Sequence, residues 1–514
     1  MTEPPGASAP GPRRHRAAGA GGLWRRPATD GGRGRRAAFD GERGRRAAFD
    51  GVRGRPAATG SGWWRTGPEH PLPAPSVHPE GSRQAAFVLQ VFILTVFLFP
   101  SDTVIRVIGA QGYVAGITAI VLFLAWAVTA ILGFHDPVHT RYPVRGALGF
   151  FWIASLLSYA MMPFYSPDAT QRLSADRWVM LLIGMSGVIL MAAEHLRSWP
   201  DILRVVRMVV WGGAFSGFVA LFQFWFRWDL KPYLRMPLVG FEHDGAYSGF
   251  QARDALMRVS GTANHPIELG VIAALILPLA LWLAFYDTAR RPLRRWAPAG
   301  VIGMCIPMSV SRSAILSLAV ALAVLIVLLP VVNRAKMLAF LPVGIVVIFA
   351  TTPGYLRTIL GSFTGAGTDP SITNRLNNYP RVWAAVQERP WLGQGGGTDI
   401  APDATKILDN QYLKSAIELG GVGLLALCLY FFVPVVAALI ARTWFTEEAP
   451  RALCAAIGGA CLVAGVGSFT FDAFSFAQFA AVHALVVGLS GTLWLHARRT
   501  DSRRTPTLPH EVSA

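Results

Sequence analysis

Long apolar runs with almost no charged residues constrain this chain more than any other feature of its sequence. The first run begins near Gln84 and the last ends near residue 495. A transmembrane helix needs about 20 apolar residues, whereas the strands of an outer-membrane barrel alternate polar and apolar residues over about ten. The runs have the helical length and do not alternate. They predict an all-α, polytopic membrane protein and exclude a soluble enzyme and a barrel.

The runs predict about twelve membrane-spanning helices. We place them at residues 84–100, 113–134, 145–163, 178–193, 205–225, 266–286, 297–310, 313–332, 337–352, 416–440, 451–469 and 475–495. Only 15% of the residues are charged, compared with about 25% in soluble proteins. The four cysteines fall within these runs, and their spacing indicates neither an external disulfide nor a zinc site.

Positive charge is concentrated toward the N-terminus. The formal net charge is +17, and residues 1–83 hold 15 arginines and 7 acidic residues, which leaves +8 there. This Gly-, Pro- and Arg-rich stretch contains an imperfect ten-residue repeat, and its composition predicts a disordered tail. The Arg-Gly runs allow RNA binding as an alternative, but aromatic residues for base stacking are sparse. We therefore expect contact with anionic membrane lipids and no nucleic acid.

The basic residues also indicate orientation, because loops rich in arginine and lysine stay in the cytoplasm. With the first tail inside, arginines fall in the connections after the second, fourth, sixth, eighth and tenth spans. We expect a membrane domain at 84–495 in the cytoplasmic membrane, a basic tail at 496–514 and both termini in the cytoplasm. Two long connections, 226–265 and 353–415, then lie outside, where long loops are usually functional.

Four polar clusters lie at the outer face in this topology. The first runs from Arg258 to Glu268 and places Asn264 and His265 beside a helix that starts at Pro266. Backbone N–H groups at such a helix start favour an anion. The alternative is a capped helix entry with a solvated arginine.

The second cluster is Ser-Val-Ser-Arg-Ser-Ala over residues 309–314, in a turn so short that Arg312 lies close to hydrocarbon. An arginine there is costly unless it is paired or binds a ligand. Because no acid is nearby in sequence, we expect Arg312 to bind a ligand. Snorkelling to the membrane surface is the alternative.

The third cluster combines arginines with a glycine-rich turn. Arg375, Arg381 and Arg389 precede the run Leu-Gly-Gln-Gly-Gly-Gly, which contains Gly395 and Gly397. Guanidinium groups and glycine N–H groups suit a diphosphate. No Gly-Lys-Ser/Thr follows, so the run does not indicate an ATP-binding loop.

The fourth cluster begins with Asp409 and Asn410 and continues through Gln-Tyr-Leu to Glu-Leu-Gly-Gly at the start of a span. Asp409 suits a general base or a group that orients a hydroxyl. Alternatively, Asp409 and Asn410 cap the following helix. We interpret Asp472 as another cap, and His483, alone within a span, as a packing residue.

In this order the motifs resemble the O-antigen ligase and O-antigen polymerase family. They read Arg…Gly-Thr…Asn-His-Pro, Ser-Arg-Ser-Ala, Arg…Trp…Pro-Trp-Leu-Gly-Gln-Gly and Asp-Asn-Gln-Tyr-Leu…Glu-Leu-Gly, between residues 205 and 440. The resemblance implies a glycosyltransferase at the outer face of the cytoplasmic membrane, without a nucleotide, metal or other cofactor. It passes a glycan from undecaprenyl diphosphate to a glycan or lipid acceptor.

The resemblance also implies roles for individual residues. Carried over by motif, Arg258, Arg312 and Arg375 bind the diphosphate, and Arg381 is a further candidate. Family ligases have histidine before the asparagine of the fourth motif, where this chain has Asp409. An aspartate, with a reference pKa of about 3.9, is the weaker base at neutral pH, so the exchange favours a polymerase over a lipid A core ligase. His265 is an alternative base.

A secondary transporter of a small anion or glycan precursor is the main alternative from another class. Ion-coupled carriers place ionisable groups or broken helices near the membrane midplane. Here the spans hold few charges and the polar clusters gather at one face, which favours chemistry at the surface. A peptidoglycan-type polymerase and a scaffold fit the motifs less well.

Overall fold

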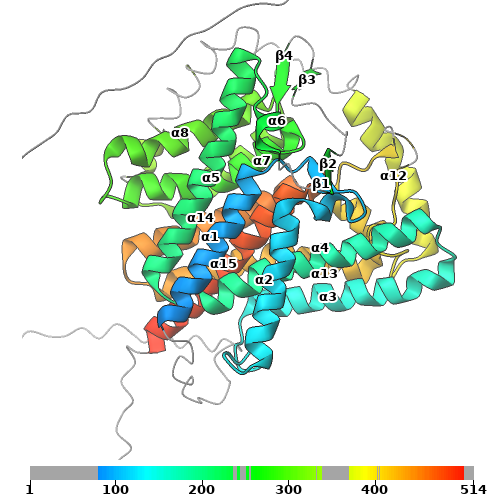
Figure 1. Ribbon diagram of the computed structural model, residues 1–514, viewed down its shortest axis with the longest axis horizontal. Helices are drawn as coiled ribbons and strands as arrows, with labels where there is room; N and C mark the ends of the chain where they lie inside the picture. The colour runs from blue at the N-terminus through cyan, green and yellow to red at the C-terminus, as the bar shows by residue number, and fades with distance from the viewer. Residues whose placement is uncertain are drawn as a thin grey trace, which may run out of the picture. The chain divides into compact units, whose positions relative to one another are not determined.

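Long helices dominate the part of the chain that the structure describes (Figure 1). The computed structural model describes residues 79–235, 240–243, 250–253, 256–331, 333–338, 346, 370–401, 403 and 406–502. The expected N-terminal tail up to residue 78 and the end of the C-terminal tail, 503–514, lie outside these residues. So does the expected span at 337–352, apart from three positions.

Each of the other eleven expected spans coincides with a helix. They are α1 (Pro79–Leu98), α2 (Val114–Ile131), α3 (Pro143–Met161), α4 (Ala169–His195), α5 (Trp199–Phe226), α7 (Pro266–Tyr286), α8 (Pro292–Met308), α9 (Arg312–Leu328), α13 (Gln411–Trp444), α14 (Glu448–Gly467) and α15 (Ala477–Ser502). Within the described ranges, nine helices are long and apolar enough to cross a membrane, while α8 and α9 have 17 residues each. The prediction of an all-α polytopic membrane protein is confirmed.

Small residues allow the helices to approach one another closely, as is usual in membranes. In α4, Gly187 lies against α2 so closely that a Cβ would be 2.4 Å from the backbone nitrogen of Phe123. α4 also packs against α15, and α13 packs against α3, α14 and α15 (Figure 1). α7 contacts α8, α9 and α14, and α1 packs against α5. These contacts bury one continuous apolar core.

Polar contacts join one set of helix ends. Arg207 at the start of α5 forms an ion pair of 2.9 Å with Asp287 at the end of α7. The hydroxyl of Tyr286 donates to Glu448 at the start of α14 at 2.8 Å, and Arg442 near the end of α13 donates to the last turn of α9. We call this set of helix ends the arginine-rich end. It comprises the starts of α3, α5, α8 and α14 and the ends of α4, α7, α9 and α13. The opposite ends form the motif end.

The two long connections have structure of their own. The first contains α6 (Lys231–Leu234) and the strands β2 (Phe241–His243), β3 (Phe250–Arg253) and β4 (Leu256–Val259). β2 pairs antiparallel with β1 (Thr103–Ile105), and β3 pairs antiparallel with β4. The second contains α12 (Pro370–Glu388). These elements place several of the polar motifs on regular backbone.

Candidate functional site

Arg258 links the first two polar clusters. It lies on β4, half-buried, and its Nε donates a hydrogen bond of 2.9 Å to the carbonyl oxygen of Ser309. Ser309 follows the last residue of α8, directly before the turn that leads to Arg312. Two clusters that are about fifty residues apart in sequence therefore meet at the motif end.

The backbone of the segment that follows Arg258 is bound by two buried charged side chains, Lys231 and Glu268. Lys231 of α6 is fully buried, and its Nζ donates to the carbonyl of Ala263 at 2.6 Å. Glu268, in the first turn of α7, accepts from the backbone N–H of Asn264 at 2.9 Å and from that of Phe479 at 3.0 Å. Its carboxylate thus lies at the start of α7 and of α15, where the helix dipole favours a negative charge.

His265 is the N-terminal cap of α7. Its Nδ1 accepts from the backbone N–H of Ile267 at 3.1 Å. Burial, with a smaller effect from the positive charges of Arg258 and Lys231, lowers the pKa of His265 to about 3. The imidazole is therefore uncharged at neutral pH and a weak base, which argues against His265 as the proton acceptor.

The second cluster contains a backbone conformation that its residues rarely adopt. Val310 has a φ of 45°, in the left-handed region that is sterically unfavourable for a β-branched side chain. Such a conformation costs on the order of 1–3 kcal/mol and is often found at functional sites. It lets α8 end and α9 begin within four residues, with Ser311 as the cap and Arg312 as the first helical residue. Arg312 is half-buried there.

A turn at residues 468–476, between α14 and α15, joins these clusters to the fourth. The hydroxyl of Ser313 donates to the turn at 3.3 Å, and the backbone N–H of Gln411 donates to it at 2.9 Å. Lys414 in α13 forms a 2.6 Å ion pair with Asp472. As expected of a cap, Asp472 directly precedes a short helix, η4 (Ala473–Ser475), but its side chain makes no capping hydrogen bond and pairs with Lys414 instead.

Asn410 caps α13 in the fourth cluster. Its Oδ1 accepts from the backbone N–H groups of Tyr412 at 2.9 Å and Leu413 at 3.1 Å. The capping alternative is therefore confirmed for Asn410. Asp409 directly precedes this cap, is half-buried and is not the capping residue.

The glycine-rich turn is bound to a break in α13. Gly420 has a φ of 66°, which interrupts the helix. The carbonyl of Glu418 accepts from the N–H of Gly395 at 2.9 Å, and the N–H of Gly421 donates back to the loop at 2.8 Å. The fit leaves no room for side chains, since a Cβ on Gly393 would lie 2.3 Å from the carbonyl oxygen of Glu418. The loop backbone thus replaces the helical hydrogen bonds lost at the break.

The side chain of Glu418 accepts hydrogen bonds from the glycine-rich turn, where the sequence predicted a diphosphate. It is fully buried, its Oε1 accepts from the backbone N–H of Asp399 at 3.2 Å, and the backbone of Gly397 adds a further hydrogen bond. The N–H groups of Gly395 and Gly397 therefore have protein partners, which does not support their expected role as diphosphate ligands. The sequence placed Glu418 in the fourth cluster but assigned it no role, because its contact with the glycine-rich turn arises only from tertiary packing.

The arginines of the third cluster differ in their surroundings. Arg381 forms an ion pair of 3.2 Å with Asp399, next to Glu418. The guanidinium of Arg389 lies 3.9 Å from the ring centroid of Tyr165, a cation–π contact. Arg375 lies on α12, but its side chain falls outside the described residues.

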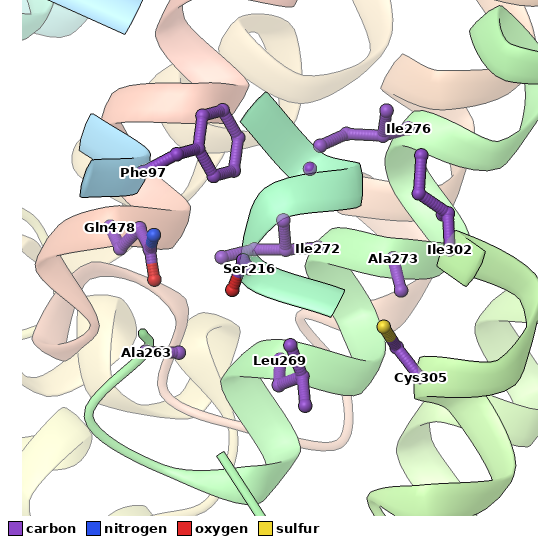
Figure 2. Close-up of a pocket in the computed structure, with 11 residues that line it drawn as sticks. Phe97, Ser216, Ala263, Leu269, Ile272, Ala273, Ile276, Ile302, Cys305 and Gln478 are labelled. Carbon is purple, nitrogen blue, oxygen red and sulfur yellow. The ribbon is translucent and has the colours of Figure 1, made fainter. Parts of the chain in front are cut away.

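A small cavity lies next to the first cluster, between α1, α5, α7, α8 and α15. Figure 2 shows its lining, which is apolar apart from Ser216 and Gln478. The cavity has a volume of about 10 Å³, which is enough for about one water molecule and too small for a sugar. The motif end itself, and not this cavity, is the candidate functional site.

The fold and the site define a class: a polytopic helical membrane protein whose first, second and fourth polar clusters are joined by hydrogen bonds at one set of helix ends, the motif end. Residues 297–428 match a family model described as O-antigen ligase, and this segment contains the second, third and fourth clusters. The match confirms the family resemblance that the motifs indicate and supports a membrane enzyme of surface polysaccharide assembly. Arg258 lies before the matched segment. A comparison with curated proteins gives no match.

Proposed function

We propose that the protein is a glycosyltransferase that extends or transfers a surface polysaccharide carried on undecaprenyl diphosphate, at the outer face of the cytoplasmic membrane. One observation carries this proposal: Arg258 binds the backbone of Ser309, beside the turn that presents Arg312, at the motif end. Guanidinium groups from two separate stretches of chain suit a diphosphate that leaves from a lipid at a membrane surface.

In the proposed reaction an acceptor hydroxyl attacks the anomeric carbon of the donor glycan. The new glycosidic bond forms as the bond between the sugar and the diphosphate breaks, and the diphosphate leaves with the bonding electrons. Arg258, Arg312 and Arg375 stabilise its growing negative charge, an effect that is stronger at a membrane boundary than in bulk water. Asp409 orients the acceptor hydroxyl and takes its proton.

Substitution of the arginines tests these roles. Arg258→Ala should reduce polymer formation by about 10²–10³-fold, the usual effect of losing one positioned charge-stabilising group. Arg312→Lys keeps the charge but loses the planar guanidinium fork, and it should also lose activity. Arg227→Ala is the matched control, because Arg227 is exposed in the same connection and its side chain bonds, among the described residues, to Met257 outside the clusters. Normal polysaccharide from both variants, at normal membrane levels of protein, would reject the proposed roles.

We favour a polymerase over a ligase, since Asp409 stands where the family ligases have histidine. A deletion strain separates the two activities. Single repeat units displayed without longer chains indicate a polymerase, whereas accumulation of full-length polymer on the lipid carrier indicates a ligase.

A transporter is the second candidate, and the break in α13 favours it. Broken helices with a buried carboxylate, such as Glu418 beside Gly420, line the substrate sites of many carriers. Here, however, the loop backbone at residues 390–395 fills the break. Uptake of a labelled glycan precursor or small anion into vesicles that contain the purified protein would favour the transporter.

A further inference from the structure

A pocket of about 480 Å³ lies at the arginine-rich end, on the side of the molecule opposite to the clusters described above. It is formed by the end of α9, the end of α13 and the start of α14. Its lining combines apolar residues at the end of α9, among them Val327 and Leu328, with the charged residues Arg442, Glu448 and Arg451. A volume of this size is typical of small-molecule sites.

The two arginines of the pocket differ in their partners. Arg442 donates from one terminal nitrogen to the carbonyl of Leu328 at 3.0 Å, so it also closes the end of α9. Arg451 is exposed and forms no ion pair with any residue that the structure describes. The single acid of the lining, Glu448, accepts a hydrogen bond from Tyr286. The pocket therefore has a net positive charge and one guanidinium that is available to a ligand.

The apolar wall of the pocket continues onto exposed apolar side chains at the end of α9. Val327 on the last turn of α9 is 72% exposed, and Val331 just beyond it is 73% exposed. An amphiphile can thus place a phosphate near Arg451 while its acyl chain lies along these valines. A free phosphate would gain nothing from the apolar wall.

We propose that this pocket binds the headgroup of an anionic phospholipid. Phosphoglycerol headgroups match the chemistry of the site, because guanidinium groups bind phosphate oxygens in a bidentate manner. Basic residues at the cytoplasmic surface attract anionic lipid by about 1 kcal/mol each. The site is independent of the proposed glycosyl transfer, which uses the other set of helix ends.

Native mass spectrometry of the full chain in detergent tests the proposal, with phosphatidylglycerol and phosphatidylcholine as probes. We expect tighter binding of phosphatidylglycerol to the wild type, and a preference about fivefold weaker in Arg451→Ala, which corresponds to about 1 kcal/mol. Arg294→Ala is the matched control, because Arg294 is exposed at the same end but lies outside the pocket. It should bind as the wild type does.

Three outcomes would overturn the proposal. Equal losses in Arg451→Ala and Arg294→Ala would mean a diffuse charge effect. Equal binding of the two lipids would mean an apolar contact only. Displacement of the bound lipid by millimolar inorganic phosphate would mean a site for a free anion. Because Arg451 is exposed, its replacement leaves the fold intact, and an unchanged melting temperature of the variant in phosphatidylcholine checks this.

Discussion

His265, a candidate base by its sequence position, instead caps α7 with its ring nitrogen in the folded protein. Its folded pKa of about 3 lies well below the ordinary value of 6.5, chiefly because the ring is buried. Between these two values the unfolded chain binds the proton and the native protein does not, so the free energy of unfolding falls as the pH drops through this window. Above a pH of about 6.5 this contribution is fully present.

We therefore predict that His265→Asn reduces the acid sensitivity of the protein. Asparagine is a favoured helix cap and does not titrate. The fall in melting temperature in detergent between about pH 7 and pH 5 should be clearly smaller than in the wild type. Equal falls in the wild type and in His265→Asn would contradict the assignment.

At the scale of single elements, the break in α13 depends on one glycine. A Cβ at Gly420 would lie 2.4 Å from the backbone of Trp391, and its φ of 66° alone costs about 1–2 kcal/mol for other residues. Gly420→Ala should therefore lower the melting temperature far more than Gly421→Ala, because a Cβ at Gly421 would meet only a carbonyl oxygen at 3.2 Å. Equal thermal stability of the two variants in detergent would contradict the interlocked geometry.

The same break marks the limit of sequence reasoning about elements. The apolar pattern places eleven helices correctly, because the cost of exposing polar backbone to lipid leaves few alternatives. The glycine-rich turn suggested a diphosphate loop, since glycines beside arginines suit an anion. The pattern could not show that the turn's backbone N–H groups bind a side chain of the same protein, Glu418, because that contact depends on tertiary packing.

At the scale of the whole molecule, the motifs predicted that the clusters meet more accurately than they predicted what each residue binds. Arg258 meets the second cluster, and the turn at 468–476 joins the second cluster to the fourth. The expected spans leave a short turn there, but its mostly aromatic or small residues gave no sign that its backbone joins two clusters. Lys414 was missed for a related reason, since its partner Asp472 is far away in the chain.

The orientation of the whole molecule in the membrane provides the last prediction. The arginine-rich end is expected in the cytoplasm, because basic loops are retained there. Two exposed positions can carry a single cysteine as a reporter of the two sides. Leu293 is 78% exposed at the arginine-rich end, and Tyr379 on α12 is 49% exposed. A membrane-impermeant maleimide should label Tyr379→Cys in intact spheroplasts and Leu293→Cys only after permeabilisation. The opposite pattern would place the motif end in the cytosol, where a donor displayed outside has no access to Arg258 and Arg312. The native cysteines lie within helices, three of them fully buried, so their background labelling should be low.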